Sequence, residues 1–312
     1  MSPSQLNKLV QSRQQKTRPY LLIIPGIFDI GEHIFRNVSI ALISPSINQM
    51  LRSSVVVFAA LLLVFFLKGK LYRHHWLSIG CIVAGLVFVG LAAKSGKEHS
   101  ASQIALGICL QLVGQLSGAI SYTAEEKLMS DCDELDPTLL IGWEGFWAAA
   151  IYMILLPIFQ FVPCTNNDIC TGRVIEDTYL VFQDYGANYM LILQSLALGT
   201  LTLIINIAGV TITKIGSASQ RTVVDQMRNL TVWAYFIVVP INGAYLDKFT
   251  VMQASGFTIL LMGVLVYNEI IVLPCLGFNQ YTREKLEQRK VSQKQIKIAY
   301  ERQVSHDLNY SF

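Results

Sequence analysis

The chain has 312 residues, of which 53% are hydrophobic and only 14% are charged. A soluble domain of this size would carry about 25% charged residues, so the composition indicates a polytopic membrane protein. The formal net charge of +3 is too small to indicate a nucleic-acid partner. The sequence shows no phosphate-binding loop, nucleophile constellation or zinc-ligand spacing, so neither an enzyme nor a cofactor is predicted.

Eight apolar segments follow a polar, basic arm, residues 1–18, which lacks the apolar core of a secretory signal peptide. Each segment is close to the roughly 20 residues that a helix needs to cross the hydrocarbon core. The segments are 19–42, 45–67, 74–93, 102–124, 138–162, 187–213, 217–240 and 250–274. We therefore predict an all-α bundle of about eight transmembrane helices over residues 19–276, followed by a basic tail at 277–312.

The first segment contains a polar stripe. Asp29, Glu32, His33 and Arg36 recur at i, i+3, i+4 and i+7, and Asn37 is the next position along this face. Each charge near a bilayer centre costs roughly 2.5–3.5 kcal/mol on insertion scales. The stripe is therefore predicted to face a protein interior or a wet cavity, where it lines a path for a polar solute.

Three later segments also carry polar faces. The second carries Asn48, Gln49 and Arg52; the seventh Arg221, Asp225, Arg228 and Asn229; and the fourth Gln111 and Gln115. We predict that Asp29, Arg52, Asp225 and Arg228 converge on one central cavity. The full predicted set of solute-binding residues is Asp29, His33, Asn37, Asn48, Arg52, Gln115, Asp225, Arg228 and Asn229.

An alternative interpretation is internal charge pairing. Asp29 would then pair with Arg36, and Asp225 with Arg228, so that these residues only hold the bundle together. This explains poorly why three helices carry such faces, because an apolar pair would be cheaper to bury. His33 likewise has two interpretations: a proton sensor with an unperturbed pKa near neutrality, or a neutral ring that packs through hydrogen bonds.

The second and third segments resemble the seventh and eighth. Gln49–Arg52 aligns with Asp225–Arg228, and Gly80 falls on Gly256 at the same offset of 176 residues. The first copy is predicted to run inward and the second outward. This is the pattern of an inverted-topology repeat, in which solute sites form near the membrane midplane.

Lysine and arginine gather in the N-terminal arm, in the loop after the second segment and in the C-terminal tail. With eight spans these regions share one side, so both termini are predicted to be cytosolic. The loop at 125–137 is acidic and opposes this orientation, but acidic residues weigh little in the positive-inside rule. Glu125 and Glu126 are predicted to end the fourth helix at the cytosolic interface. Residues 281–304 are interpreted either as a helix on anionic lipid or as a solvated, disordered tail.

Two further pairs of residues were considered as possible sites. Cys164 and Cys170 lie in the longest external loop, where they form a disulfide or remain two free thiols. His74 and His75 lie in a basic interfacial loop, and no metal site is predicted there.

Five short stretches occur in an order that resembles a known family: Ile24–Asp29, Gln49–Arg52, Glu125–Lys127, Gly142–Phe146 and Asp225–Arg228. Together they resemble the drug/metabolite transporter superfamily. Within it, they are most similar to the group of solute carrier 35 subfamily F member 6-like proteins, relatives of chloroquine-resistance-transporter-like proteins. No single stretch is specific, but the ordered set is.

The resemblance implies a bundle of five plus five helices that opens alternately to the cytosol and the lumen. In this chain the first, second, sixth and seventh segments would surround the solute, with the fourth also lining. The family's first two helices have no counterpart, which indicates an incomplete gene product or a degenerate member. The cysteine-bearing loop matches a luminal loop in which relatives also carry cysteines.

Two functions follow from the resemblance. The first is a secondary-active transporter of a small polar or amphipathic solute, nucleotide-sugar-like or another metabolite, in a lysosomal, vacuolar or Golgi membrane. The second is a non-transporting membrane subunit or scaffold that retains the fold. The expected partners are the solute and membrane lipids, and the resemblance allows a homodimer or a larger membrane complex.

Overall fold

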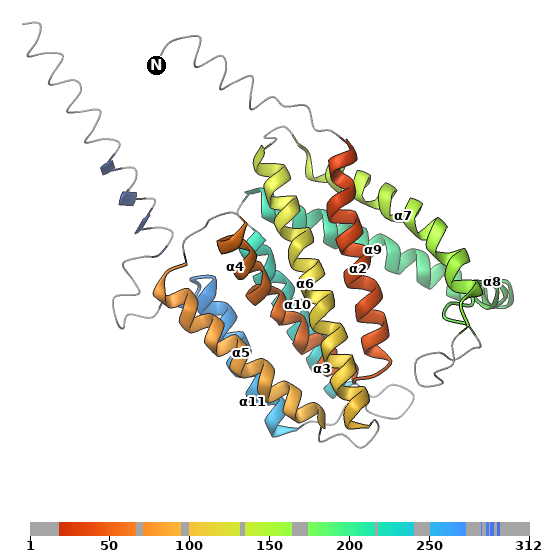
Figure 1. Cartoon of the computed structure of the whole chain (residues 1–312), viewed down its shortest axis with the longest axis horizontal. Helices are drawn as coiled ribbons and strands as arrows, with labels where there is room; N and C mark the ends of the chain where they lie inside the picture. The colour runs from red at the N-terminus through yellow and green to blue at the C-terminus, as the bar shows by residue number, and fades with distance from the viewer. Residues whose placement is uncertain are drawn as a thin grey trace, which may run out of the picture.

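The computed structural model confirms an all-α polytopic architecture (Figure 1). The structure describes residues 19–66, 71–94, 100–131, 135–163, 174–215, 218–239 and 250–272, together with single positions between 282 and 293. Over these residues the β-structure is limited to one isolated antiparallel bridge, between Pro163 and Val174.

Every one of the eight predicted segments is helical. The elements are η1 (Pro19–Leu22), α2 (Ile23–Ile40), α3 (Pro45–Leu51), η2 (Arg52–Ser54), α4 (Val55–Phe65), α5 (Arg73–Lys94), α6 (Ala101–Asp131), α7 (Pro137–Phe161), α8 (Thr178–Ala187), α9 (Tyr189–Ile215), α10 (Ala218–Val238) and α11 (Val251–Tyr267). The short helix α8 was not predicted. The second predicted segment is divided into α3, η2 and α4, and it begins where Pro45 takes the first helical position after extended Ser44.

Among the residues that the structure describes, five helical stretches are long and apolar enough to cross a membrane: Pro45–Phe65, Arg73–Ala92, Ala101–Ser130, Pro137–Phe161 and Tyr189–Ile215. The apolar helix α11 is shorter, with 17 residues. The other two predicted spans, α2 and α10, each carry three charged Asp, Glu or Arg side chains, which sets them apart from these apolar helices.

Helix α2 packs along α6, side by side in Figure 1, and small residues of α6 permit the close approach. A Cβ atom on Gly114 would lie 3.2 Å from Phe35 Cβ, and one on Gly118 would collide with the Glu32 carboxylate. The Gly114-x3-Gly118 pattern therefore brings the charged face of α2 against α6.

Helices α5 and α11 cross closely at one edge of the molecule (Figure 1). A Cβ atom on Gly85 would lie 2.8 Å from Gly256 O and 2.7 Å from Leu260 Cβ. A Cβ atom on Gly263 would lie 3.0 Å from Ser78 O and 2.8 Å from Ile82 Cγ1. The two sets of contacts mirror each other. Each α5 residue then corresponds to the α11 residue 178 positions later, as Gly85 corresponds to Gly263.

The predicted correspondence of Gly80 with Gly256 is therefore wrong. Gly80 is exposed, and nothing lies within 4 Å of a Cβ built on it, whereas Gly256 lies inside the α5–α11 interface. At this interface the contacts favour a repeat offset of 178 residues. This is two residues longer than the offset of 176 that separates Arg52 from Arg228. The match of one glycine with another within apolar sequence was therefore a poor guide to the repeat offset.

Most of the surface of α8 and α9 is exposed and apolar. No residue of α8 is buried, and within α9 only Val210 and Thr213 are. Figure 1 shows α8 at the edge opposite α5 and α11. Such a surface suits contact with lipid chains or with another helix of a membrane complex.

Candidate functional site

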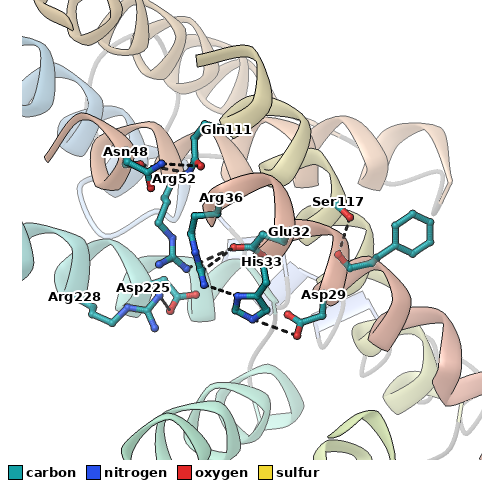
Figure 2. A network of polar contacts seen from close by, with 11 residues as sticks. Asp29, Glu32, His33, Arg36, Asn48, Arg52, Gln111, Ser117, Asp225 and Arg228 are labelled. Atoms are coloured by element: carbon teal, nitrogen blue, oxygen red, sulfur yellow. Dashed lines mark hydrogen bonds and ion pairs between the residues drawn. The ribbon is translucent and has the colours of Figure 1, made fainter. Parts of the chain in front are cut away.

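Glu32 is the centre of a network of charges between α2 and η2 (Figure 2). Its carboxylate atom Oε1 lies 3.7 Å from Nη1 of Arg36, one turn along α2, and 3.6 Å from Nη2 of Arg52 in η2. The Glu32 side chain is only 6% exposed. Two guanidinium groups from different elements therefore share one buried carboxylate oxygen, and neither is as close as a charge-assisted hydrogen bond would be.

His33 extends this network to Asp29. A nitrogen of Arg36 (Nη2) donates a hydrogen bond to Nδ1 of His33, and Nε2 of His33 lies 3.5 Å from Oδ2 of Asp29. Because a guanidinium only donates, Nδ1 must accept, and the ring proton is left on Nε2, facing Asp29. The expected Asp29–Arg36 ion pair is replaced by this chain of contacts, and His33 has the geometry of the neutral, hydrogen-bonded interpretation.

The second ion pair of the alternative interpretation, internal charge pairing, is present on α10. Nη2 of Arg228 lies 3.2 Å from Oδ1 of Asp225, one turn earlier. Figure 2 shows this pair on the side to which the guanidinium groups of Arg36 and Arg52 point. Tyr122 of α6 interacts electrostatically with both Asp225 and Arg52. We call Asp29, Glu32, His33, Arg36, Arg52, Asp225 and Arg228 the charge cluster.

Asn48 has a structural position rather than a place in the charge cluster. It is fully buried, and its Nδ2 atom donates to Gln111 Oε1 and to Ser39 Oγ, each at 3.1 Å. Ser39 in turn donates to the carbonyl of Gly107 at 2.8 Å. These bonds fix α3 against α2 and α6, and so they place Arg52, one turn after Asn48, beside Glu32 (Figure 2).

A second group of buried hydrogen bonds connects η2 with α10. Gln226 Oε1 accepts hydrogen bonds from the hydroxyl of Ser53 and, at 3.3 Å, from Nδ2 of Asn229. Asn229 is 1% exposed and Gln115 is 2% exposed. Within the described residues, Oδ1 of Asn229 and Nε2 of Gln115 have no hydrogen-bond partner. Both predicted residues are thus buried, each with one polar atom still able to bond.

Glu125 was predicted to end the fourth helix at the cytosolic interface, and this is wrong. Helix α6 continues to Asp131, and Glu125 is buried, with its Oε2 atom 2.5 Å from Nη1 of Arg221. The Arg221 guanidinium also lies 4.2 Å from the ring centroid of Tyr122. The helix passes beyond Glu125 because Arg221, far away in sequence, neutralises the carboxylate inside the bundle.

The remaining predicted residues lie elsewhere. Asn37 is exposed and takes no part in the contacts described for the cluster. Cys164 and Cys170 lie outside the described residues, as does most of the C-terminal tail. Glu32 and Arg36 lie on the predicted polar stripe but were not among the predicted solute-binding residues. Their position beside Arg52 depends on a second element and could not be predicted from one helix.

The charge cluster holds three arginines and three acidic residues in ion pairs that are mostly longer than hydrogen bonds. In such an arrangement an arginine can exchange its acidic partner within the protein for an anionic group of a solute at little structural cost. It suits a solute with at least one anionic group and further polar groups.

Comparisons with known proteins identify the family. Residues 4–91 match the model of the EamA-like transporter family. Solute carrier family 35 member F6 of Rattus norvegicus is 30% identical over 269 residues, which cover 85% of this chain and 71% of the relative. The chain belongs to solute carrier family 35.

Two further relatives are similar over most of the chain. The human solute carrier family 35 member F6 is 30% identical over 258 residues, covering 82% of this chain and 68% of the relative. An uncharacterized protein of Schizosaccharomyces pombe is 30% identical over 259 residues, covering 81% and 75%. A solved crystal structure aligns with 85% of this chain at 15% identity and a TM-score of 0.38, which is too low to carry an argument.

This member of solute carrier family 35 is an integral membrane protein with a transporter fold. Its rat and human relatives are named as solute carriers.

Proposed function

We propose that this chain is a secondary-active transporter that moves a small polar or amphipathic solute across an endomembrane by alternating access. The observation that carries the proposal is the convergence of Arg36 and Arg52, from two different elements, on one oxygen of Glu32. A bundle that needed only to be held together would gain more from apolar packing at this place.

In this proposal the solute binds at the charge cluster. An anionic group of the solute competes with Glu32 for the Arg36 and Arg52 guanidinium groups, and the Asp225–Arg228 pair opens to bind a second polar group. Arg52 and Arg228 are the matching positions of the two repeats and therefore lie on opposite sides of the solute. Solutes of the nucleotide-sugar or small-metabolite class carry the required combination of anionic and polar groups.

His33 is the group through which a proton is coupled to the solute. Nδ1 of His33 accepts from Arg36, so protonation of Nδ1 places two donors against each other and releases Arg36. The charged neighbours are Asp29, Glu32 and Arg36 on α2, while Tyr152 of α7 interacts electrostatically with Asp29 and Arg36. His33→Gln should then flatten the dependence of uptake on a pH gradient; an unchanged dependence would leave His33 as a packing residue.

In the proposed orientation both termini are cytosolic, as the distribution of lysine and arginine favours, and the exposed faces of α8 and α9 contact lipid or a further subunit of a membrane complex. The compartment is lysosomal, vacuolar or Golgi.

The test is uptake by the purified chain in proteoliposomes. Three panels of labelled solutes are offered: nucleotide sugars, small peptides and organic cations. Accumulation of an anionic, polar solute in sealed vesicles, above protein-free vesicles, supports the proposal. Uptake of none of them by a folded chain favours the non-transporting subunit or scaffold instead.

A further inference from the structure

Two neighbouring histidines and a distant glutamate meet where α5 begins and α11 ends. His74 and His75 lie in the first turn of α5, not in a loop as predicted, and Glu269 follows α11. Nε2 of His74 lies 3.1 Å from Oε1 of Glu269. One ligand atom from each of the three residues lies within 4.8 Å of the other two.

We propose that His74, His75 and Glu269 bind a divalent transition-metal ion, with Zn²⁺ the best suited. Zinc bonds to imidazole nitrogen and carboxylate oxygen are roughly 2.0–2.2 Å long, so two ligands on one tetrahedral ion lie roughly 3.3 Å apart. The His74–Glu269 distance of 3.1 Å already meets this requirement. Small rotations of His75 would complete a site with two histidines and one glutamate, leaving a fourth position for water.

The surrounding structure holds these ligands in place. Glu269 has a φ of 58°, a left-handed conformation that a side-chain-bearing residue rarely adopts, and its amide donates to Val266 O at 3.1 Å. The ring of Tyr267 meets His75 edge-on at 5.1 Å between centroids, and Tyr72 stacks on His74 at 6.2 Å. The turn aims the carboxylate back at α5, and the two tyrosines enclose the imidazoles.

His75 is the weakest of the three ligands. Its Nδ1 atom accepts a hydrogen bond from the amide of Tyr72 at 3.2 Å. Coordination through this atom replaces that bond, so the loss of His75 should cost less affinity than the loss of Glu269.

The site would join the two helices whose glycine crossing forms one edge of the bundle. His74 connects these helices without a metal as well, because its hydrogen bond to Glu269 already joins α5 to the end of α11. Metal binding would displace the proton between these two atoms and replace the hydrogen bond with a stronger connection through the ion. The sequence could not indicate this site, because 195 residues separate His74 from Glu269.

The test is Zn²⁺ binding by the purified full chain in detergent, measured by competition with a chromophoric chelator, with Co²⁺ absorption as a second readout. The wild type should bind one equivalent. Glu269→Gln should weaken binding by more than the roughly 10–100-fold that loss of an outer partner costs, and His75→Ala should weaken it less. The control variants His99→Ala and His306→Ala, which change histidines outside the proposed site, should bind as the wild type does.

Two outcomes would overturn the proposal. One is the absence of stoichiometric Zn²⁺ binding by the wild type at micromolar metal. The other is unchanged binding by both Glu269→Gln and His75→Ala, which would place the metal on other residues. These variants were chosen because Glu269 and His75 are only half-buried, whereas replacement of the buried His74 endangers folding; thermal unfolding without metal confirms that each variant is folded.

Discussion

Nη2 of Arg52 lies 3.6 Å from Oε1 of Glu32, and this contact joins η2 to α2 across the middle of the bundle. Arg36 approaches the same oxygen at 3.7 Å, and Figure 2 shows the two guanidinium groups next to each other on one side of the carboxylate. The carboxylate therefore offsets the repulsion between two like charges that lie close together. Removal of Glu32 and removal of one arginine are not equivalent changes.

The first prediction compares these changes. Glu32→Gln leaves Arg36 and Arg52 without a counter-charge and should destabilise the protein by about 3 kcal/mol, at the lower end of the cost of breaking a buried pair. Arg52→Gln should cost clearly less, because Glu32 keeps Arg36. The measurement is the free energy of unfolding in detergent. Equal losses for the two variants would show that the arginines do not share the carboxylate.

The second prediction concerns Glu125 and Arg221, both buried and 2.5 Å apart. Arg221→Met leaves a buried carboxylate without its partner and should cost about 3–5 kcal/mol. The double variant Glu125→Leu/Arg221→Met replaces the pair by apolar side chains and should regain most of this loss. Denaturant unfolding of both variants provides the test, and a double variant as unstable as the single one would argue against an isolated pair.

The third prediction uses two glycines of α5. Gly85→Ala places a methyl group 2.8 Å from a backbone oxygen of α11 and should destabilise by about 1–3 kcal/mol, the usual cost of overpacking. Gly80→Ala meets nothing within 4 Å and should stabilise the helix by about 0.5–1 kcal/mol. Thermal unfolding should move in opposite directions for these variants. A loss of stability in Gly80→Ala would mean that Gly80 is packed against another helix, as Gly256 is, and would favour the repeat offset of 176 residues.

The fourth prediction is a pH dependence outside the membrane. Asp136 caps α7: its carboxylate accepts from the amide of Thr138 at 2.7 Å, and this bond holds the pKa of Asp136 below its ordinary value. A lowered pKa stabilises the fold at pH values above the unfolded pKa of about 3.9, and the effect disappears as the pH falls through the folded pKa.

Asp136→Asn is the matched control, because asparagine caps a helix about as well but does not titrate in this range. Unfolding of the wild type and of this variant should differ more at pH 7 than at pH 3. A difference that stays constant between these pH values would mean that Asp136 contributes no ionised cap.

Much of the fold follows from local sequence. The apolar runs predicted all eight segments, and the i, i+3 spacing allowed the Asp225–Arg228 pair as an alternative interpretation, because both depend on near neighbours. Contacts between distant segments were not predictable. Arg221 neutralises Glu125 from 96 residues away, so the visible charge on α6 was mistaken for a helix end.

The same limit applies to the site. The stripe on α2 was recognised as polar, yet its most buried member, Glu32, was left out of the solute-binding set. Its importance arises only where η2 brings Arg52 to it. Asn48 was predicted to bind solute because it is polar and lies within a span; its Nδ2 atom is bonded to Gln111 and Ser39, whereas its Oδ1 atom has no hydrogen-bond partner within the described residues. One helix shows which residues are polar, and only the packing shows which remain available.

The central claim is that the charge cluster binds the transported solute, and uptake by Arg52→Ala tests it most directly. Proteoliposomes containing the wild type, Arg52→Ala or Asp136→Asn are compared for the solute that the wild type accumulates. Unfolding in detergent first shows that each variant is folded. We predict that Arg52→Ala abolishes uptake while Asp136→Asn, at the end of α7, transports at the wild-type rate; wild-type uptake by folded Arg52→Ala would contradict the claim.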